Sequence, residues 1–345
     1  MSMHSYCTYF DSGYLDKGLV MLRSLRAHNE AVPLFVLALD ECTRAVLESA
    51  GPAKLTILTL NQIQTAYPAL ENLKRQRSRA EFIWTLTPHL LEYLLDNEKL
   101  ECCTYLDADL WFYDDPDILN RELEEPDCQT LITPHRFPNK PKYRELERRH
   151  GKYCVQFNTF GTGSESRRLL SWWKDRVLEN CEYNTRKGLG GDQKYLEQFT
   201  EMSTDVHELT HQGGGVAPWN LSRYLPDAQA QTIETALPGQ PEIILCDSET
   251  GLCFPLLFYH FANIKYLNQR LVNISVGQAD VRLKNAIYRP YLREVRRTRF
   301  ELGSTYGIVF SGGRSVSRNY FSAFAQRYLA RIRLKDFAVS DLIRF

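Results

Sequence analysis

The sequence predicts an α/β fold in which a mostly parallel sheet carries helices on both faces. One observation is that short apolar runs alternate with amphipathic helical segments through the first half of the chain. Another is that residues 33–39 are apolar throughout, as in a parallel strand that is buried on both faces. Strands that alternate with helices are joined by crossovers, which make them parallel.

The elements follow in chain order from their periodicity and their breakers. Leu19, Leu22 and Leu25 share one face of a helical stretch. Gly51 and Pro52 end the next helix. The sequence thus predicts strands at 5–10, 33–39, 54–60 and 102–111, and helices at 17–28, 41–49, 82–95 and 193–199.

The composition allows an enzyme with a full core and gives no electrostatic case for binding nucleic acid. Of the 345 residues 43% are hydrophobic, enough for a large domain with an appendage or for two unequal domains. The 42 basic residues balance the 42 acidic ones, so no net charge attracts a phosphate backbone. Residues 292–345, however, contain eleven basic residues and only four acidic ones.

The cysteines and the start of the chain predict a protein of the reducing cytoplasm. Nine cysteines are an odd number without a Cys-x-x-Cys pair, and Cys102, Cys103 and Cys154 lie in apolar surroundings. This pattern favours free thiols over disulfides. The chain opens without a basic and apolar signal segment, and no run approaches the roughly eighteen apolar residues of a membrane span. We therefore expect a soluble, unexported protein.

Two carboxylates, Asp107 and Asp109, lie two residues apart in the otherwise apolar Tyr-Leu-Asp-Ala-Asp-Leu-Trp-Phe. In an extended strand, side chains at i and i+2 point to the same face, so both carboxylates should project together. They lie toward the carboxyl end of the strand, where open α/β sheets bind ligands. Two adjacent negative charges repel unless a cation separates them. The pair predicts a divalent-metal site, and two ordinary surface acids are the alternative.

Four later stretches combine polar side chains with glycines or aromatic rings. They are 153–163, which places Asn158 in an apolar strand; Gly-Gly-Asp-Gln at 190–193; a glycine loop that leads to Trp219 and Asn220; and Phe-Tyr-His-Phe at 258–261, followed by Lys265. Glycines let a ligand approach the backbone closely. We expect these stretches to border a binding site.

In order and content these motifs resemble the GT-A fold glycosyltransferases, and within them the retaining glycosyltransferase family eight, which includes glycogenin and bacterial lipopolysaccharide galactosyltransferases. The resemblance covers roughly residues 5–268 and rests on five ordered motifs taken together. It implies a Rossmann-like nucleotide-diphospho-sugar transferase fold with a mixed, mostly parallel sheet. It also implies transfer of a hexose from a nucleoside-diphosphate sugar, foremost a UDP-sugar, to a carbohydrate acceptor with retention.

The resemblance assigns a metal centre. Asp107 and Asp109 match the metal-binding Asp-x-Asp motif, and His260 matches the histidine that completes the metal shell. A hard divalent ion prefers oxygen ligands, and one imidazole shifts the preference from Mg²⁺ toward Mn²⁺. Such an ion would stabilise the charge that develops on a departing nucleoside diphosphate. A lone histidine in an apolar stretch is otherwise more often a hydrogen-bonded core residue.

The resemblance also places residues beside the reacting carbon of the sugar. Asp192 and Gln193 match an Asp-Gln pair next to the anomeric carbon, and Asn158 matches a strand residue that touches the donor sugar or the acceptor. Asp192 could steady a positively charged sugar centre or orient the acceptor hydroxyl. It could instead cap the helix that follows it, or do both.

Five further residues are implied to bind the donor. Thr8 and Tyr14 lie in a segment that resembles the base-binding region, although its spacing differs by a residue or two. Trp219 and Asn220 match a Trp-Asn step, and Lys265 matches a basic residue near the diphosphate. A packed loop without contact to ligand is the alternative for Trp219 and Asn220.

One position departs from the family pattern. A lysine or arginine is expected shortly before the helix that precedes the acid pair, and the nearest match here is Ala80. Arg79 adjoins it and Arg77 is close, so Arg79 is the candidate for the diphosphate contact.

A different motif supports an alternative function. The residues His207, Glu208 and His211 form a His-Glu-x-x-His sequence, which on a helix binds zinc in metalloproteases. Glycines begin two residues after the second histidine, and Ala217 occupies the position of the third ligand of metzincins, which argues against this reading. A nucleotide-sugar binding protein without turnover is a further alternative. A nucleotidyltransferase is disfavoured because residues 9–17 lack a glycine-rich basic signature.

The expected organisation is a catalytic domain at 1–270 and a basic, mainly helical extension at 271–345. Within the catalytic domain, residues 1–115 would bind the nucleotide-sugar and residues 116–270 would face the acceptor. Arg293, Arg296, Arg297 and Arg299, and the basic stretch 320–334, indicate a solvated helical surface. They could instead attach the protein to the inner face of a membrane, where a lipid-linked glycan would be met during surface-polysaccharide or lipopolysaccharide-type synthesis.

Overall fold

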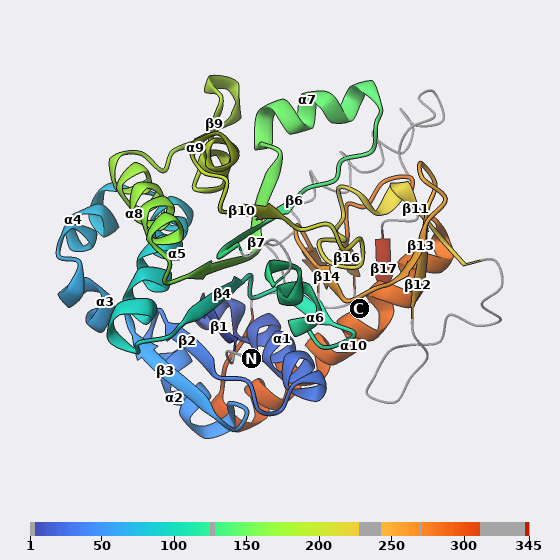
Figure 1. The fold of residues 1–345 in the computed structure, drawn as a ribbon. Coiled ribbons are helices and arrows are strands. Elements are labelled where there is room, and N and C mark those ends of the chain that lie inside the picture. The colour runs from blue at the N-terminus through green and yellow to red at the C-terminus, as the bar shows by residue number, and fades with distance from the viewer. Residues whose placement is uncertain (1–3, 125–127, 228–242, 269–270, 311–341, 345) are drawn as a thin grey trace.

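A seven-stranded, mostly parallel sheet forms the centre of the protein (Figure 1). The computed structural model describes residues 4–124, 128–227, 243–268, 271–310 and 342–344. The strand order is β10-β6-β7-β4-β1-β2-β3, and β7 runs antiparallel to both of its neighbours. The strands are β1 (Ser5–Phe10), β2 (Leu34–Ala38), β3 (Leu55–Thr59), β4 (Cys102–Leu106), β6 (Thr130–Pro134), β7 (Tyr153–Gly161) and β10 (Val206–Glu208). The predicted α/β fold is confirmed.

Helices cover both faces of this sheet because successive side chains of its strands point to opposite sides. In β1, Cys7 and Tyr9 enter one hydrophobic cluster, whereas Tyr6 and Phe10 enter another. The first cluster lies under α3 (Leu60–Ala66), α4 (Ala69–Gln76), α5 (Arg79–Asn97), α8 (Ser164–Glu179), the 3-10 helix η4 (Gln193–Gln198) and α9 (Phe199–Met202). The second lies under α1 (Leu15–His28), α2 (Glu41–Ala50), α6 (Asp117–Asn120) and the 3-10 turn η2 (Arg121–Leu123).

Most predicted elements are found within a few residues of their expected bounds. The strand at 5–10 is β1, and the helices at 17–28, 41–49 and 82–95 correspond to α1, α2 and α5. Helix α5 begins earlier than expected because Ser78 and Glu81 form a reciprocal cap at its start. The predicted helix at 193–199 is instead 3-10 through η4, and only its last residue enters α9.

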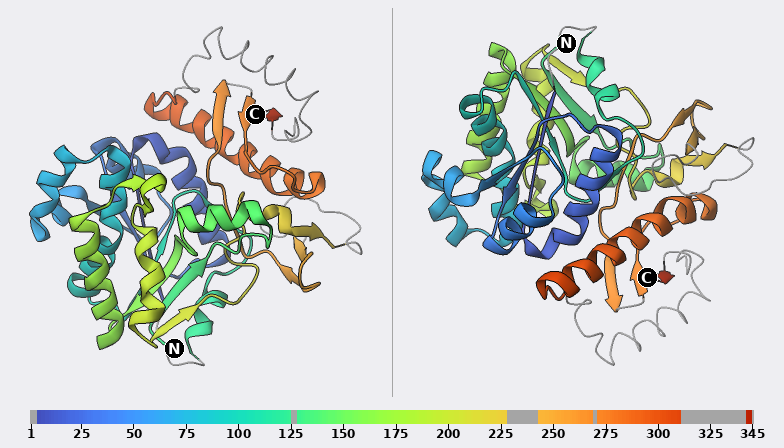
Figure 2. Two further views of the ribbon diagram at one scale, coloured as in Figure 1. Left: turned by 90° about the horizontal axis from the view of Figure 1, so that it is seen from above. Right: turned by 90° about the horizontal axis from the view of Figure 1, so that it is seen from below.

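The C-terminal part adds a third hydrophobic cluster beside the sheet. The 26-residue helix α10 (Val281–Tyr306) packs along α1 (Figure 2). Smaller strands complete this part of the chain: β11 (Tyr224–Pro226), β12 (Ile244–Asp247), β13 (Cys253–Pro255), β14 (Phe258–His260), β15 (Lys265–Asn268), β16 (Leu271–Asn273) and β17 (Leu342–Arg344). The short strand β5 (Leu110–Phe112), which follows β4, pairs with β14. The remaining elements of the described residues are α7 (Pro141–His150), the hairpin β8 (Tyr183–Asn184) and β9 (Leu189–Gly190), and the 3-10 turns η1 (Ser12–Tyr14), η3 (Thr185–Lys187) and η5 (Leu221–Arg223).

The basic residues of α10 are only partly solvated. Arg299 donates to Asp16 of α1 over 2.6 Å and lies over the ring of Tyr266, so its charge faces the interior. Arg297 pairs with Glu301 at 3.1 Å, and Arg293 and Arg296 are exposed. The second basic stretch, 320–334, lies outside the described residues.

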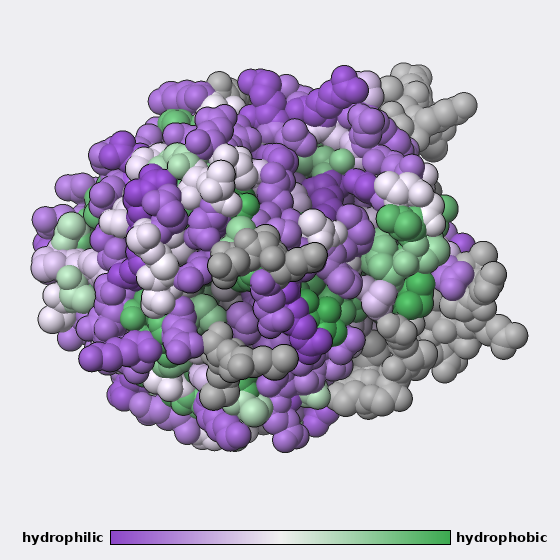
Figure 3. Space-filling view, in the orientation of Figure 1, coloured by the Kyte–Doolittle hydropathy of each residue, from purple (hydrophilic) through white to green (hydrophobic). Residues whose placement is uncertain are grey.

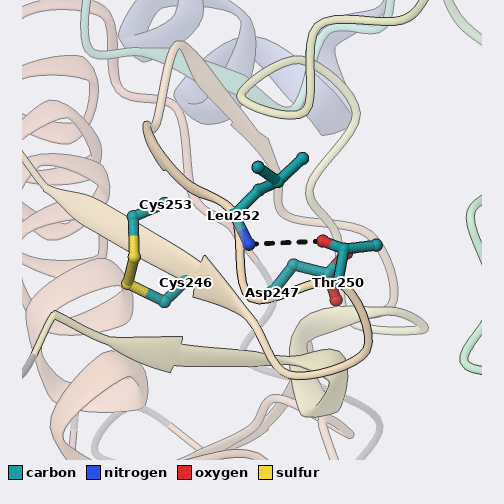
Figure 4. Close-up of a disulfide and its surroundings, with 5 residues drawn as sticks. All are labelled: Cys246, Asp247, Thr250, Leu252 and Cys253. Carbon is teal, nitrogen blue, oxygen red and sulfur yellow. Dashed lines mark hydrogen bonds between the residues drawn. A yellow bond between two sulfur atoms is a disulfide. The ribbon is translucent and has the colours of Figure 1, made fainter.

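One pair of cysteines corrects the expectation of free thiols. Cys246 of β12 and Cys253 of β13 form a disulfide, with their Cα atoms 4.0 Å apart (Figure 4). The two strands are antiparallel and place these residues directly opposite one another, a register that spacing alone does not predict. In the turn between them, Thr250 accepts a hydrogen bond from the Leu252 amide. The other seven cysteines form no disulfide.

The surface in view is largely hydrophilic, with a hydrophobic patch over the region of β11 to β13 (Figure 3). This small sheet carries two exposed leucines, Leu225 and Leu252. Within the described ranges, none of the helices has the length and apolarity required to cross a bilayer.

Candidate active site

A cavity of about 720 Å³ opens where several strands of the central sheet end. Phe10 and Asp11 come from the end of β1, Leu39 follows β2, and Asp107 follows β4. These are carboxyl ends of parallel strands, where α/β sheets bind ligands. Asp192, on the loop before η4, lines the same cavity.

The acid pair lies in a turn, and the prediction of one continuous strand at 102–111 is wrong. β4 ends at Leu106, the Leu110 amide donates to the Asp107 carbonyl, and β5 then begins. The chain breaks here because it changes partners. β4 pairs with β1 and β7, whereas β5 pairs with β14.

This change of partner brings a distant histidine to the two acids. In the β5–β14 pair His260 lies opposite Leu110, and the Phe261 amide donates to the Asp109 carbonyl over 2.8 Å. His260 Nε2 is 3.0 Å from Asp109 Oδ1 and 3.5 Å from Asp107 Oδ2. The three predicted metal ligands therefore converge at one point on the cavity wall.

The donor set fits a divalent cation. Two carboxylates and one imidazole meet in the cavity, and the other ring nitrogen of His260, Nδ1, is 2.9 Å from Gln156 Oε1. With Nδ1–H donating to this amide oxygen, Nε2 is left to face the acids, the arrangement that commonly orients a metal-bound histidine. Gln156 is a positioning residue that the sequence did not single out.

The three groups have strongly shifted pKa values. Burial raises the pKa of Asp107. Burial acts in the same direction on Asp109, but the attraction of His260 and Lys17 outweighs it and lowers the pKa to about 2. Burial would lower the pKa of His260, yet the two carboxylates raise it well above its usual range. Without a metal the imidazolium thus serves as the counter-ion of the acids.

Cys154 also reaches this centre. Its Sγ lies with ligand atoms of Asp107 and His260 in a group whose members are all within 4.8 Å of one another. Burial raises the pKa of the Cys154 thiol, which keeps it protonated beside the oxygen donors. The sequence showed only a cysteine in an apolar strand.

Lys17 is a buried cation that the sequence analysis did not select. Its Nζ is 3.9 Å from Asp109 Oδ2 and 4.1 Å from the centre of the Tyr14 ring. Burial would lower the pKa of this amine, but Tyr14 and Asp109 raise it instead. A permanent positive charge therefore stands beside the acid pair, where an anionic ligand would be attracted.

The predicted diphosphate arginine reaches the cavity. Arg79 is the first residue of α5, lines the cavity and forms an ion pair with Asp11. Ala80 lines the cavity as well. Arg77, by contrast, turns away, because its guanidinium donates to the Thr85 hydroxyl and to the carbonyl of Val177.

Asp192 is held close to the acid pair without capping a helix. Its side chain makes no capping hydrogen bond to η4, so the capping alternative is wrong. Oδ2 accepts from Thr87 over 3.2 Å, and Thr87 in turn lies 2.8 Å from the Tyr9 hydroxyl. Burial, followed by repulsion from Asp107, raises the pKa of Asp192 to about 7.

Some of the remaining predicted residues line the cavity, and others do not. Tyr14, Gln193 and Trp219 line the cavity. Gln193 donates to the His150 carbonyl, and Trp219 donates to the His135 carbonyl and lies edge-on to His260.

Four predicted residues do not line the cavity. Thr8 is buried within β1, and the side-chain oxygen of Asn158 accepts from the Thr133 amide. Asn220 is fully buried and ties together the Ala217 amide and the carbonyls of His135 and Gly215. Lys265 is exposed on β15.

The His-Glu-x-x-His sequence does not form a zinc-protease helix. His207 and Glu208 lie in β10, because Ser203 leaves the helical conformation after α9 and the chain extends to pair with β6. His207 bonds Glu122, and Glu208 bonds Lys152. His211 accepts from the Gly213 amide. The protease alternative is wrong for this segment, since the motif needs both histidines on one helical face.

Comparison with known proteins identifies the family. No family model matches the chain. The uncharacterised protein YfnF of Bacillus subtilis strain 168 is 31% identical over 274 residues, covering 76% of this chain and 82% of YfnF. The chain belongs to the YfnF family. A second protein of that strain, the uncharacterised YfnD, is 26% identical over 314 residues, covering 89% of this chain and 93% of YfnD.

Solved structures were also matched. Mouse xyloside xylosyltransferase 1 covers 60% of this chain and 84% of its own at 14% identity, with a TM-score of 0.42. The galactosyltransferase LgtC, solved with donor and acceptor sugar analogues, covers 75% and 87% at 14% identity, with a TM-score of 0.46. Both TM-scores are below 0.5, so these structures carry no argument about family. The assignment to the YfnF family rests on the 31% sequence identity alone.

Proposed function

We propose that this YfnF-family protein is a metal-dependent GT-A glycosyltransferase of the retaining, family-eight type. It would move a hexose from a nucleoside-diphosphate sugar, foremost a UDP-sugar, to a carbohydrate acceptor. The observation that carries the proposal is the convergence of Asp107, Asp109 and His260 in one cavity, with His260 Nε2 3.5 Å from the Asp107 carboxylate and 3.0 Å from that of Asp109. Lys17 stands beside them, and Asp192 lies on the same cavity wall.

The three converging ligands would hold Mn²⁺ or Mg²⁺, with the imidazole favouring Mn²⁺. When bound, such an ion supplies positive charge that stabilises a departing diphosphate. Lys17 adds a charge of the same sign from within the protein, and burial keeps that charge poorly screened. Arg79 reaches the cavity from the start of α5 and is proposed as a second, more exposed contact to the diphosphate.

Asp192 is proposed as the residue that faces the reacting sugar carbon. Its pKa of about 7 makes it a group that gains or loses charge near neutral pH, as a group does that orients an acceptor hydroxyl or steadies a positively charged sugar. Thr87 and Tyr9 hold it in place. Gln193 follows it in the sequence and would bind a sugar hydroxyl.

The other predicted site residues are assigned by their positions. Tyr14 and Trp219 line the cavity, so we propose that they contact the base and the sugar respectively. Thr8, Asn158 and Asn220 are buried behind the wall, and we propose that they support its shape. Lys265 is exposed and would reach a diphosphate only after a movement of β15.

We further propose the domain arrangement, the pathway and the location. Residues 1–270 would form the catalytic unit, with the nucleotide-sugar held within 1–115 and the acceptor within 116–270, and residues 271–345 an added basic region. The acceptor would be a glycan, carried on lipid in surface-polysaccharide or lipopolysaccharide-type synthesis. The protein would act in the cytoplasm, with the exposed Arg293 and Arg296 attracted to an anionic membrane surface.

The proposal is tested by a panel of nucleotide-sugars with Mn²⁺. We expect at least one to raise the melting temperature of the wild type and to be hydrolysed slowly, and we expect Asp109→Ala to lose both responses. If no nucleotide-sugar stabilises the protein, or if the variant responds equally, the proposal fails. Stabilisation without any turnover would support the alternative of a non-catalytic nucleotide-sugar binding protein.

A further inference from the structure

The cavity has a second end whose lining differs from that of the metal centre. Among the described residues that line it, those with a charged side chain, histidines aside, are Asp11, Arg79, Asp107, Asp109 and Asp192. The first four lie around the metal centre and the end of β1. The rest of the lining includes aromatic, aliphatic and neutral polar residues, among them Ile83, Trp84, Phe137, Leu146, His150, Tyr183, Gly190 and Gln193.

Two partly exposed aromatic rings form the centre of this wall. The rings of Trp84 on α5 and Tyr183 on β8 lie 5.4 Å apart, and 43% of the Tyr183 surface is exposed. Exposed aromatic rings in a concave site commonly serve as ligand contacts. The C–H groups on one face of a pyranose ring are apolar and slightly positive, which suits the negative face of an aromatic ring.

Two contacts hold the rings in place. The Tyr183 amide donates to Glu81 over 3.2 Å, which docks the β8–β9 hairpin onto the start of α5. Gly191, with φ of +65°, lies against the indole, since a Cβ at this position would come within 3.0 Å of the Trp84 ring. Because Gly191 immediately precedes Asp192, the platform lies next to that carboxylate.

Polar groups at the edge of the platform are neutral and suit sugar hydroxyls. The Tyr183 hydroxyl lies 2.8 Å from His150 Nδ1. Burial, followed by the nearby Arg149 and Lys194, lowers the pKa of His150, so the ring is neutral at physiological pH. The Gln193 amide donates to the His150 carbonyl over 2.7 Å, and its carbonyl oxygen remains able to accept from a ligand.

We propose that Trp84 and Tyr183 form the platform of a subsite for a neutral pyranose, which places the ring of the acceptor sugar beside Asp192. The role as an acceptor subsite rests on the proposed function; the sugar-binding platform itself does not. A neutral ring is favoured over a uronic or sialic acid because the described cavity lining carries four aspartates, and its one lysine or arginine, Arg79, already pairs with Asp11.

The platform is tested by the direct binding of methyl glucopyranoside, galactopyranoside and mannopyranoside, measured by saturation-transfer NMR on the full-length protein. We expect saturable, weak binding of at least one of them. Trp84→Ala and Tyr183→Ala should each weaken it by about tenfold, while Trp84→Phe should retain most of it. Trp172→Ala is the matched control, because that indole packs against Tyr195 and Phe199 outside the cavity.

Several outcomes would overturn the inference. Binding of none of the three glycosides, equal binding by Trp84→Ala and wild type, or an equal loss in Trp172→Ala would each remove the platform. Methyl glucuronide binding as tightly as methyl glucoside would overturn the preference for a neutral ring. If no nucleotide-sugar with Mn²⁺ stabilises the wild type, the glycosyltransferase proposal fails. The binding of methyl glycosides is measured without a donor, so that result tests the platform separately.

Discussion

Two parts of the cavity differ in their side chains: one is charged and the other is aromatic and neutral. At the acidic end, Asp109, His260 and Lys17 are buried and Asp107 is half-buried, and burial and mutual attraction shift the pKa values of all four groups. At the aromatic end, Trp84 and Tyr183 are partly exposed and neutral. Buried charges interact strongly because water does not screen them, whereas ring stacking contributes about 1 kcal/mol. We therefore expect substitutions at the acidic end to change activity and ligand binding far more than substitutions at the aromatic end.

The largest effect is expected for Asp109→Ala. Removing this carboxylate takes away one of two oxygen ligands and leaves His260 without its nearest partner, so transfer should fall by about 1,000-fold or more. The rate of UDP-sugar turnover with Mn²⁺ measures it. Asp175→Ala, an exposed acid on α8, is the control and should behave as wild type. Comparable activity in both variants would contradict a metal role for the acid pair.

Asp192→Asn should lower the rate of transfer by about 100-fold with little change in donor affinity. The amide keeps the size of the side chain and its contact with Thr87 but cannot carry negative charge. Turnover at saturating donor, together with the donor dissociation constant, separates the two quantities. A variant that loses donor binding and rate in equal proportion would move Asp192 from the reacting carbon to the donor site.

The same carboxyl predicts a pH dependence of stability. Its pKa is raised from 3.8 to about 7, so between these values the folded state holds a proton that the unfolded state has released. Folding stability therefore falls as pH rises through this window. Relative to Asp192→Asn, the wild type should lose about 2 kcal/mol between pH 5 and pH 7.

Urea unfolding of the two metal-free proteins at both pH values measures this difference, and the shared titrations of other groups largely cancel in the comparison. A constant difference across the window would mean that Asp192 is already ionised in the folded protein at pH 5.

Lys17→Met should raise the affinity for Mn²⁺ alone and lower the affinity for a UDP-sugar with Mn²⁺. Methionine keeps most of the side-chain volume but removes a charge that lies 3.9 Å from Asp109. Mn²⁺ alone should then bind several-fold more tightly, because a like charge is gone, while a UDP-sugar with Mn²⁺ should bind about tenfold more weakly. Calorimetric titration with each ligand tests this. Weakening of both would indicate that Lys17 supports the fold of the acidic end instead.

Arg79→Ala should give the smallest change. The side chain is 65% exposed and already paired with Asp11, so solvent screening leaves it an effect of about twofold on donor affinity. Arg75→Ala, an exposed arginine on α4, is the control. A loss as large as that of Lys17→Met would show that Arg79 is the principal diphosphate contact.

The sequence predicted the central sheet better than the part beyond it. Hydrophobic runs at 5–10 and 33–39, with helices between them, follow from local periodicity, and these elements were found with small shifts. The break after Leu106 was missed, because nothing in the octapeptide shows that β5 leaves the sheet to pair with β14. The Cys246–Cys253 bond was missed for the same reason, since strand register is a property of the pair.

The residues that converge at the acidic end were predicted from the sequence, but the residues that surround them were not. Asp107, Asp109 and His260 were found from their motifs, and the structure brings them together. Lys17, Gln156 and Cys154 were not found. Each looks like an ordinary member of its helix or strand, and only its neighbours give it a role. One signal was present for Lys17, a lysine within an apolar helix beside Tyr14.

Periodicity and residue type are local, and they were enough to predict the α/β class, the positions of most sheet elements and the acids at the end of a strand. That His260 lies opposite Leu110, and that Trp84 and Tyr183 line the same cavity as Asp192, follows from the folded arrangement of the chain. These contacts join residues that are distant in the chain, and their geometry is fixed by strand pairing and by packing, which no single segment encodes.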